Sequence, residues 1–178
     1  MIAAFYKQSR WKNHQLLFRA VRKLIDQGTP LQVMLAGSGE KMADMQKLVR
    51  KLQLTEYIHF LGQTNLIPEL LYHSDITLLT SKEESFGMVL AEGALMKNAL
   101  IGTRGTGMEA IIKHEHTGLL FESDNLDDLV SQIKRILNDH SFAKKLGENA
   151  YEHVLENLST NASMKKLNTF YDAVKTAS

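Results

Sequence analysis

Short apolar runs alternate along the chain with longer stretches in which apolar residues recur every three or four positions. The short runs have the length of buried strands, and the longer stretches have the spacing of helices with one buried face. Strands are predicted at 2–6, 31–36, 57–61, 76–80, 99–103 and 118–121. Strands that alternate with helices predict an α/β fold: a Rossmann-like parallel sheet of about six strands with helices on both faces.

The helices between these strands have recognisable ends. Asn13 and Asn65 are expected to cap the helices that follow them, and Gly28 is expected to close the first helix. The predicted helices are 14–25, about 40–51, a short one after Asn65, one from Phe86 or Gly87 to about 95, 110–113, 126–137, 142–155 and about 159–176. No linker, repeat or low-complexity tract interrupts the pattern, so residues 1–178 are predicted to form a single domain.

Composition narrows the class of protein. Of the 178 residues, 44% are hydrophobic and 23% are charged, which is ordinary for a globular domain. The net charge of +1 gives no general electrostatic attraction to nucleic acid or to an acidic membrane. There is no cysteine and no apolar run of the roughly 18 residues that cross a membrane, so we expect a cytoplasmic protein without a transmembrane segment. Because the chain opens inside its first predicted strand, we interpret it as a fragment cut at a domain boundary.

The most informative stretch runs from Leu78 to Ala94. An apolar strand passes through a polar turn into a helix that begins near Gly87. Such a turn presents free backbone N–H groups at the carboxyl edge of the sheet, where open α/β sheets bind ligands and where anions are stabilised. Two carboxylates bracket the turn: Glu84 precedes the helix, and Glu92 follows it by eight positions. Glu92 lies more than a turn inside the helix, so it is a candidate for partial burial.

The segment Glu-Ser-Phe-Gly-Met-Val-Leu-Ala-Glu, from Glu84 to Glu92, resembles the signature of GT-B glycosyltransferases of family 4. In that family the motif lies in the C-terminal, donor-binding half. The resemblance implies that Glu84 contacts the transferred sugar and that Glu92 contacts the ribose hydroxyls. It also implies that the sugar and the diphosphate are held by backbone groups around Phe86, Gly87, Met88 and Val89.

A basic loop follows the first strand. The family usually has Gly-Arg there, with a lysine five residues after the arginine, and Lys12 matches that lysine. Lys7 stands at the arginine position, Tyr6 replaces the glycine, and Arg10 is an alternative cation. Fixed cations stabilise the charge that develops on a leaving nucleoside diphosphate. A solvated basic loop remains the alternative interpretation.

Three glycine turns follow other strands. Gly37-Ser-Gly39 lacks the third glycine of a dinucleotide fingerprint, because Met42 stands there. Gly62 ends the third strand, and the resemblance places its loop near the nucleotide base. The segment from Gly105 through Gly107 to Glu109 resembles the family's Gly-Gly-x-x-Glu loop beside the donor sugar, with one residue inserted. Glu109 is expected either to face another domain or to cap its own helix.

The pair His114 and His116 has the spacing of metal ligands on a strand, but the stretch is typical of a loop and no third ligand is near in sequence. We interpret it as a surface turn and predict no metal site. The sequence also contains no nucleophile elbow and no P-loop.

Together these features predict the donor-binding domain of a GT-B glycosyltransferase, which transfers a sugar from a nucleotide-diphosphate sugar to a glycan or glycolipid acceptor. The resemblance implies retention at the anomeric carbon and no cofactor or bound metal. The acceptor-binding N-terminal domain is absent from this chain, so we expect nucleotide binding but little or no transfer. The resemblance also leads us to expect that the missing half contacts the inner face of the membrane.

Two other function classes stay open. One is a non-catalytic nucleotide-sugar-binding or regulatory module, and the other is a sugar-nucleotide epimerase of the same fold. The sequence names neither the base, the sugar, nor the acceptor.

Overall fold

A computed structural model describes residues 2–7, 12–159, 162 and 164 of the chain. Its centre is a six-stranded sheet in the order β3-β2-β1-β4-β5-β6, in which every neighbouring pair is parallel. The strands are β1 (Ile2–Lys7), β2 (Val33–Ser38), β3 (Ile58–Gly62), β4 (Ile76–Leu78), β5 (Ala99–Thr103) and β6 (Leu119–Phe121). This confirms the predicted parallel α/β sheet.

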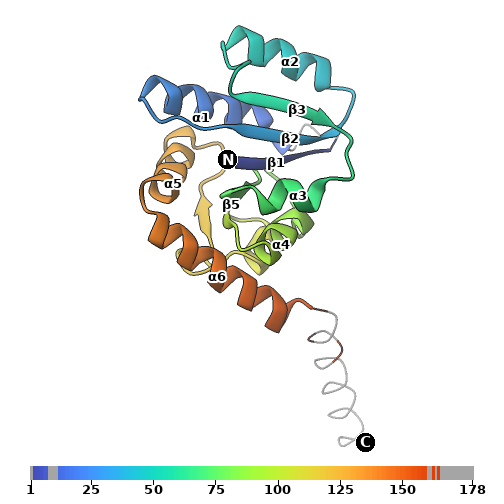
Figure 1. Cartoon of the computed structure of the whole chain (residues 1–178), viewed down its shortest axis with the longest axis vertical. Coiled ribbons are helices and arrows are strands. Elements are labelled where there is room, and N and C mark those ends of the chain that lie inside the picture. Colours follow the sequence, from blue (N-terminus) through green and yellow to red (C-terminus); the bar gives the residue numbers. More distant parts are fainter. Residues whose placement is uncertain (1, 8–11, 160–161, 163, 165–178) are drawn as a thin grey trace, which may run out of the picture.

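Helices connect the strands in the alternating order that the sequence predicts (Figure 1). They are α1 (His14–Asp26), α2 (Met42–Lys51), α3 (Ile67–Tyr72), α4 (Met88–Leu95), the 3₁₀ helix η2 (Gly107–Ala110), α5 (Leu126–Asn138) and α6 (His140–Asn157). In Figure 1, α3 and α4 lie side by side.

Two apolar clusters cover the two faces of the sheet. The larger one joins α1, α2 and α5 to inward residues of the strands, and the smaller one joins α4 and η2 to the opposite face. Successive strand residues point to opposite faces, so Leu100 belongs to the smaller cluster while Ala99 and Ile101 belong to the larger. Helix α6 contributes Leu146 to the larger cluster and Ala150 to the smaller. The helices therefore lie on both faces, as predicted.

The strand order creates a crevice in the middle of the sheet. The chain runs outward from β1 through β2 to β3, then returns to place β4 on the other side of β1. The loops that leave β1 and β4 therefore diverge toward opposite faces at the carboxyl edge. Open sheets of this order bind ligands at that switch point.

Helix α4 packs unusually close to the sheet below this crevice. A Cβ atom on Gly93 would lie 2.3 Å from Thr77 Oγ1, so only glycine fits there without movement. The buried Asn98 side chain donates to Thr77 Oγ1 and to the carbonyl of Leu71, both at 2.9 Å. This polar network fixes the strand that carries the 78–94 segment.

Several local predictions were wrong. The second strand lies two residues later than expected, because its ladder follows β1 from Ile2 to Lys7 and so includes Gly37 and Ser38. Asn13 precedes α1, but its left-handed backbone (φ 51°) leaves its side chain without a capping bond.

The other corrections concern helix starts. Leu66, not Asn65, occupies the cap position of α3, and its N–H donates to Thr64 Oγ1 at 3.1 Å. The helix expected at 110–113 is a single 3₁₀ turn that starts at Gly107, where the Thr106 hydroxyl accepts from Met108 N. The predicted helix 159–176 lies largely outside the described residues.

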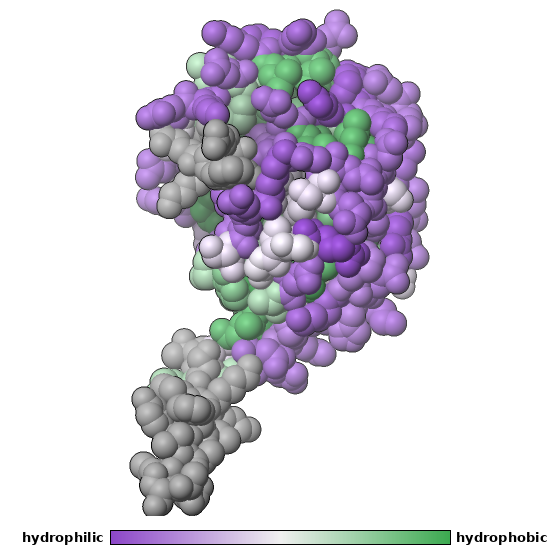
Figure 2. All heavy atoms as spheres, turned by 180° about the vertical axis from the view of Figure 1, so that it is seen from behind, coloured by the Kyte–Doolittle hydropathy of each residue, from purple (hydrophilic) through white to green (hydrophobic). Residues whose placement is uncertain are grey.

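The face turned away from the viewer of Figure 1 is mostly hydrophilic, with a few apolar patches (Figure 2). Within the part of the chain that the structure describes, no helix has the length and apolar character of a membrane span.

Candidate functional site

A pocket of about 530 Å³ opens at the carboxyl edge of the sheet, over the switch point between β1 and β4. We call it the main pocket. Its lining comes from the end of β2, from the loops after β1, β3 and β4, and from the starts of α3 and α4: Lys12, Ala36, Gly37, Gln63, Thr64, Ile67, Leu79, Glu84, Ser85, Phe86, Gly87, Met88 and Val89. Six of the predicted site residues therefore meet in one place: Lys12, Glu84, Phe86, Gly87, Met88 and Val89.

The N-terminus of α4 forms one wall of the main pocket. Gly87 occupies the cap position in a left-handed conformation (φ 86°), and no side chain caps the helix. The first N–H groups of a helix have no partner within the helix, and together with its dipole they attract an anion. Met88 and Val89 supply the first of these groups, and both residues line the pocket.

Gly87 is required for this geometry. A side chain would be strained at its positive φ, and a Cβ would lie 3.2 Å from Met108 Cγ and 3.3 Å from Leu90 Cδ1. The glycine lets the chain turn sharply from strand to helix while its backbone stays open to the pocket.

Lys12 and Glu84 both line the main pocket and form an ion pair. Their side chains are 22% and 16% exposed, so solvent screens the pair only in part. The Ser81 hydroxyl lies 3.5 Å from the same Glu84 oxygen. The arrangement places one cation and one carboxylate within reach of the same bound molecule.

The loops that carry these two residues are joined by Thr80. Its buried hydroxyl lies 2.9 Å from the carbonyl oxygen of Lys12 and 3.1 Å from that of Asn13. In the sequence, Thr80 stands out as a polar residue at the end of an apolar strand. It was nevertheless not among the predicted site residues.

A second hollow of about 490 Å³ adjoins the main pocket and shares Glu84 and Ser85 with it. Its other lining residues are Lys82, Glu83, Gly105, Thr106 and Gly107. The Gly107 N–H donates to the Glu84 carbonyl at 2.8 Å, and a Cβ on Gly107 would lie only 1.9 Å from the Ser85 carbonyl oxygen. Gly107 thus brings the loop after β5 against the loop that carries Glu84.

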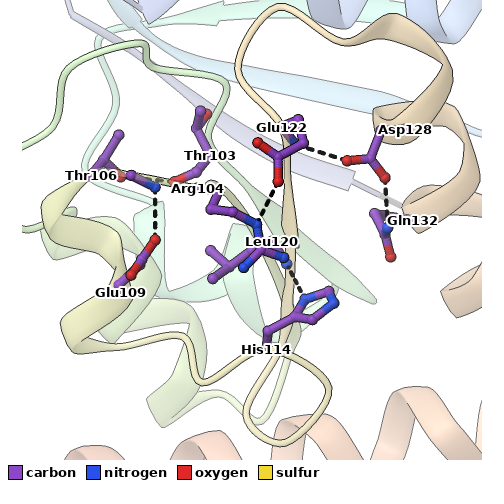
Figure 3. Close-up of polar contacts among 10 residues, drawn as sticks. Thr103, Arg104, Thr106, Glu109, His114, Leu120, Glu122, Asp128 and Gln132 are labelled. Carbon is purple, nitrogen blue, oxygen red and sulfur yellow. Dashed lines mark hydrogen bonds and ion pairs between the residues drawn. The ribbon is translucent and has the colours of Figure 1, made fainter.

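Two side-chain contacts hold the loop after β5 in place (Figure 3). The Glu109 carboxylate accepts from the Gly105 N–H at 2.7 Å, so Glu109 stabilises its own turn. Arg104 forms an ion pair with Glu122 after β6, with Nε 2.7 Å from Oε1. These contacts fix the rim of the second hollow.

Glu92 lies apart from the main pocket. It borders a third hollow between α3 and α4, lined by Ile67, Pro68, Leu71, Leu95 and Met96, which meets the main pocket at Ile67. The side chain is exposed rather than partly buried as expected, although partial desolvation raises the pKa of its carboxyl above the ordinary value. Reaching a ligand in the main pocket would require it to extend past Ile67.

Three predicted site residues remain: Gly62, Lys7 and Arg10. Gly62 ends β3 with φ 67° and lies beside the lining residues Gln63 and Thr64. Lys7 is the last residue of β1, at the same edge of the sheet. Arg10 and the side chain of Lys7 lie outside what the structure describes.

The predicted turn at His114 is confirmed. His114 Nδ1 accepts from the Leu120 N–H at 2.9 Å (Figure 3), and Glu115 pairs with Arg135. Across the described residues, no three histidine or carboxylate side chains gather as metal ligands.

Comparison with known proteins gives the family. The model of the family "Glycosyl transferases group 1" matches residues 2–153. N-acetyl-alpha-D-glucosaminyl L-malate synthase of Bacillus anthracis is 31% identical over 160 residues, which are 90% of this chain and 42% of that protein. The chain therefore spans less than half the length of this relative.

Solved structures give the same fold. A glycosyltransferase of Rickettsia africae superposes with a TM-score of 0.83 at 28% identity, over 99% of this chain and 48% of that one. Anabaena HepE, solved in complex with UDP and glucose, superposes with a TM-score of 0.85 at 20% identity, over 96% of this chain and 48% of that one. From the match over residues 2–153, we conclude that the chain belongs to the group 1 glycosyl transferases, whose solved relatives have the GT-B fold.

Proposed function

We propose that this chain is the donor-binding half of a glycosyltransferase and binds a nucleotide-diphosphate sugar in the main pocket. The observation that carries the proposal is that Lys12 and the uncapped start of α4 line the same pocket. Both groups attract the same anion, and a diphosphate is the group that a cation and a helix N-terminus bind together.

We assign the rest of the donor to the neighbouring hollows as part of this proposal. The nucleoside would extend toward Gln63 and Thr64 after β3, with its ribose hydroxyls toward Glu92. The sugar would lie beside Glu84, which borders both the main pocket and the second hollow. A carboxylate there accepts hydrogen bonds from sugar hydroxyls.

In the proposed reaction, the bond between the anomeric carbon and the diphosphate oxygen breaks, and an acceptor hydroxyl oxygen takes its place with retention. The acceptor's proton leaves with the departing nucleoside diphosphate. Lys12 and the α4 N–H groups stabilise the negative charge that develops on the leaving group, a task that a metal ion performs in other enzymes. The acceptor is a glycan or glycolipid, held by the other half of the complete enzyme.

Calorimetric titration of the purified chain with UDP, GDP and ADP tests the donor site. We expect one nucleotide to bind, and we expect Lys12→Ala and Glu92→Ala to weaken it. Lys23→Ala is the matched control, because Lys23 pairs with Asp127 on the surface and does not line the pocket. Equal binding by wild type and Lys12→Ala would contradict the proposed phosphate site.

A transfer assay tests the assignment of roles to the two halves. The chain alone is expected to show little or no sugar transfer, because the acceptor side of the cleft belongs to the absent half. Robust transfer by the 178-residue chain would overturn that expectation.

A further inference from the structure

Asp124, between β6 and α5, contacts two of the loops that line the main pocket, those after β1 and β4. One carboxylate oxygen accepts from Asn13 Nδ2 at 2.9 Å, and the other pairs with Lys82 Nζ. Asn13 follows Lys12 in the loop after β1, and Lys82 precedes Glu84 in the loop after β4. Asp124 is not among the residues that the sequence predicts for the site.

The backbone at this contact is left-handed on both sides. Asp124 has φ 60° and Asn13 has φ 51°, a conformation that asparagine and aspartate adopt more readily than other non-glycine residues. Asn13 does not cap α1, and its amide donates to Asp124 instead. The side-chain contact therefore joins two sharp turns of the backbone.

The contact is suited to setting the geometry of the loops rather than to stabilising the fold. The side chains of Lys82 and Asp124 are 40% and 55% exposed, and exposed ion pairs add little to folding stability. The hydrogen bond from Lys82, followed by that from Asn13, lowers the pKa of Asp124, so the carboxylate stays ionised at neutral pH. Its effect is therefore expected on geometry more than on stability.

We propose that Asp124 is a positioning residue of the donor site: by holding Asn13 and Lys82, it sets how the Lys12 loop and the Glu84 loop face each other. This inference rests on the proposed function. Asp124 lines neither the main pocket nor the second hollow and is proposed to act through Lys12 and Glu84, which line the main pocket. Thr80, which precedes Lys82 and Glu84, also bonds the carbonyls of Lys12 and Asn13, so Asp124 supplies a second link between the same two loops.

The test compares three variants of the chain. Asp124→Gly removes the carboxylate while a glycine accepts the positive φ without strain. Asp124→Asn restores an oxygen that can accept from Asn13 and keeps a residue tolerant of that backbone. Asp127→Asn is the matched control, because Asp127 also pairs with a lysine on the surface, Lys23, but contacts neither pocket loop.

Each variant is titrated with UDP, GDP and ADP, unfolded in urea, and compared by hydrogen exchange over residues 12–20 and 80–90. We expect Asp124→Gly to bind the nucleotide about three- to tenfold more weakly and to exchange faster in both segments, with an unchanged urea midpoint. Asp124→Asn should recover part of the affinity, and Asp127→Asn should match wild type.

Unchanged exchange and affinity in Asp124→Gly would overturn the inference. A fall in urea midpoint that tracks the affinity loss, without recovery in Asp124→Asn, would also overturn it, because it indicates a purely structural role. If wild type binds none of the three nucleotides, the proposed function fails, while the exchange comparison still decides whether Asp124 positions the two loops.

Discussion

Lys12 and Glu84, 72 positions apart in sequence, form an ion pair within the lining of the main pocket. The cation proposed to meet the diphosphate is therefore held by the carboxylate proposed to meet the sugar. Binding of a phosphate group would exchange one anionic partner of Lys12 for another.

Glu84→Gln is expected to leave nucleoside diphosphate affinity unchanged or to raise it about two- to fivefold, because Lys12 no longer has to leave a carboxylate. Titration calorimetry with the nucleotide that wild type binds measures the effect. Glu83→Gln is the control, since Glu83 also borders the second hollow but does not pair with Lys12. A marked loss of affinity in Glu84→Gln alone would show instead that the carboxylate orients Lys12 for binding.

Gly107→Ala is expected to lower the free energy of unfolding by about 1–3 kcal/mol, because the new Cβ would collide with the Ser85 carbonyl. It should also weaken nucleotide binding, since the hydrogen bond from Gly107 N to the Glu84 carbonyl would be displaced. Urea unfolding and calorimetry measure the two effects.

The matched control for this change is Gly105→Asn. Gly105 has φ 75° and open space where a Cβ would stand, and asparagine tolerates a left-handed backbone. We expect it to cost under about 1 kcal/mol. If both variants lose equal stability, the close approach of Gly107 to Ser85 does not constrain the loop.

The sequence predicts the sheet and the position of the site well, because both depend on local patterns. The strand at 99–103 was predicted with its observed bounds, and the start of α4 at Gly87 follows from a glycine between a polar turn and an apolar run. The strands of a parallel sheet all have their carboxyl ends at the same edge. The residues that follow the strands are therefore expected to meet at that edge.

Contacts between loops distant in sequence could not be predicted. Nothing in the local pattern shows that Asp124 reaches Asn13, or that Gly107 lies against Ser85, because these contacts depend on how the loops fold over the sheet edge. The burial of Glu92 was also misjudged: its position inside an apolar helix gave no information on the hollow beside α3.

Glu92 is expected to make stability depend on pH. Desolvation raises the pKa of its carboxyl in the folded state, so the folded chain holds this proton more tightly than the unfolded chain does. The contribution of Glu92 to stability is then most favourable at low pH and falls as pH rises through the raised pKa. In urea unfolding, the stability of Glu92→Gln relative to wild type should rise as the pH is raised from 4 to 7. The rise should be small, because the Glu92 side chain is exposed.

The same titration bears on the proposed ribose contact. Ribose hydroxyls donate best to the ionised carboxylate, so the advantage of wild type over Glu92→Gln in nucleotide affinity should shrink as pH falls through the raised pKa. An advantage that stays constant across this range would place the ribose away from Glu92.

Thr103 and Thr117 offer a paired test of hydrogen bonding in the core. Both side chains are buried, at 1% and 0% exposure. Thr103 Oγ1 has no hydrogen-bond partner among the described residues, whereas Thr117 Oγ1 donates to the Ile111 carbonyl and accepts from the Lys113 N–H, each at 2.8 Å.

The same substitution should therefore have opposite effects at the two positions. Thr103→Val removes a hydroxyl that costs free energy to bury without a partner, and should raise the free energy of unfolding by about 1 kcal/mol. Thr117→Val leaves a buried carbonyl and an N–H unpaired, and should lower it by about 1–3 kcal/mol. Urea unfolding at pH 7 measures both. A loss in Thr103→Val as large as that in Thr117→Val would mean that water or a ligand pairs with the Thr103 hydroxyl, at the end of the strand that leads into the second hollow.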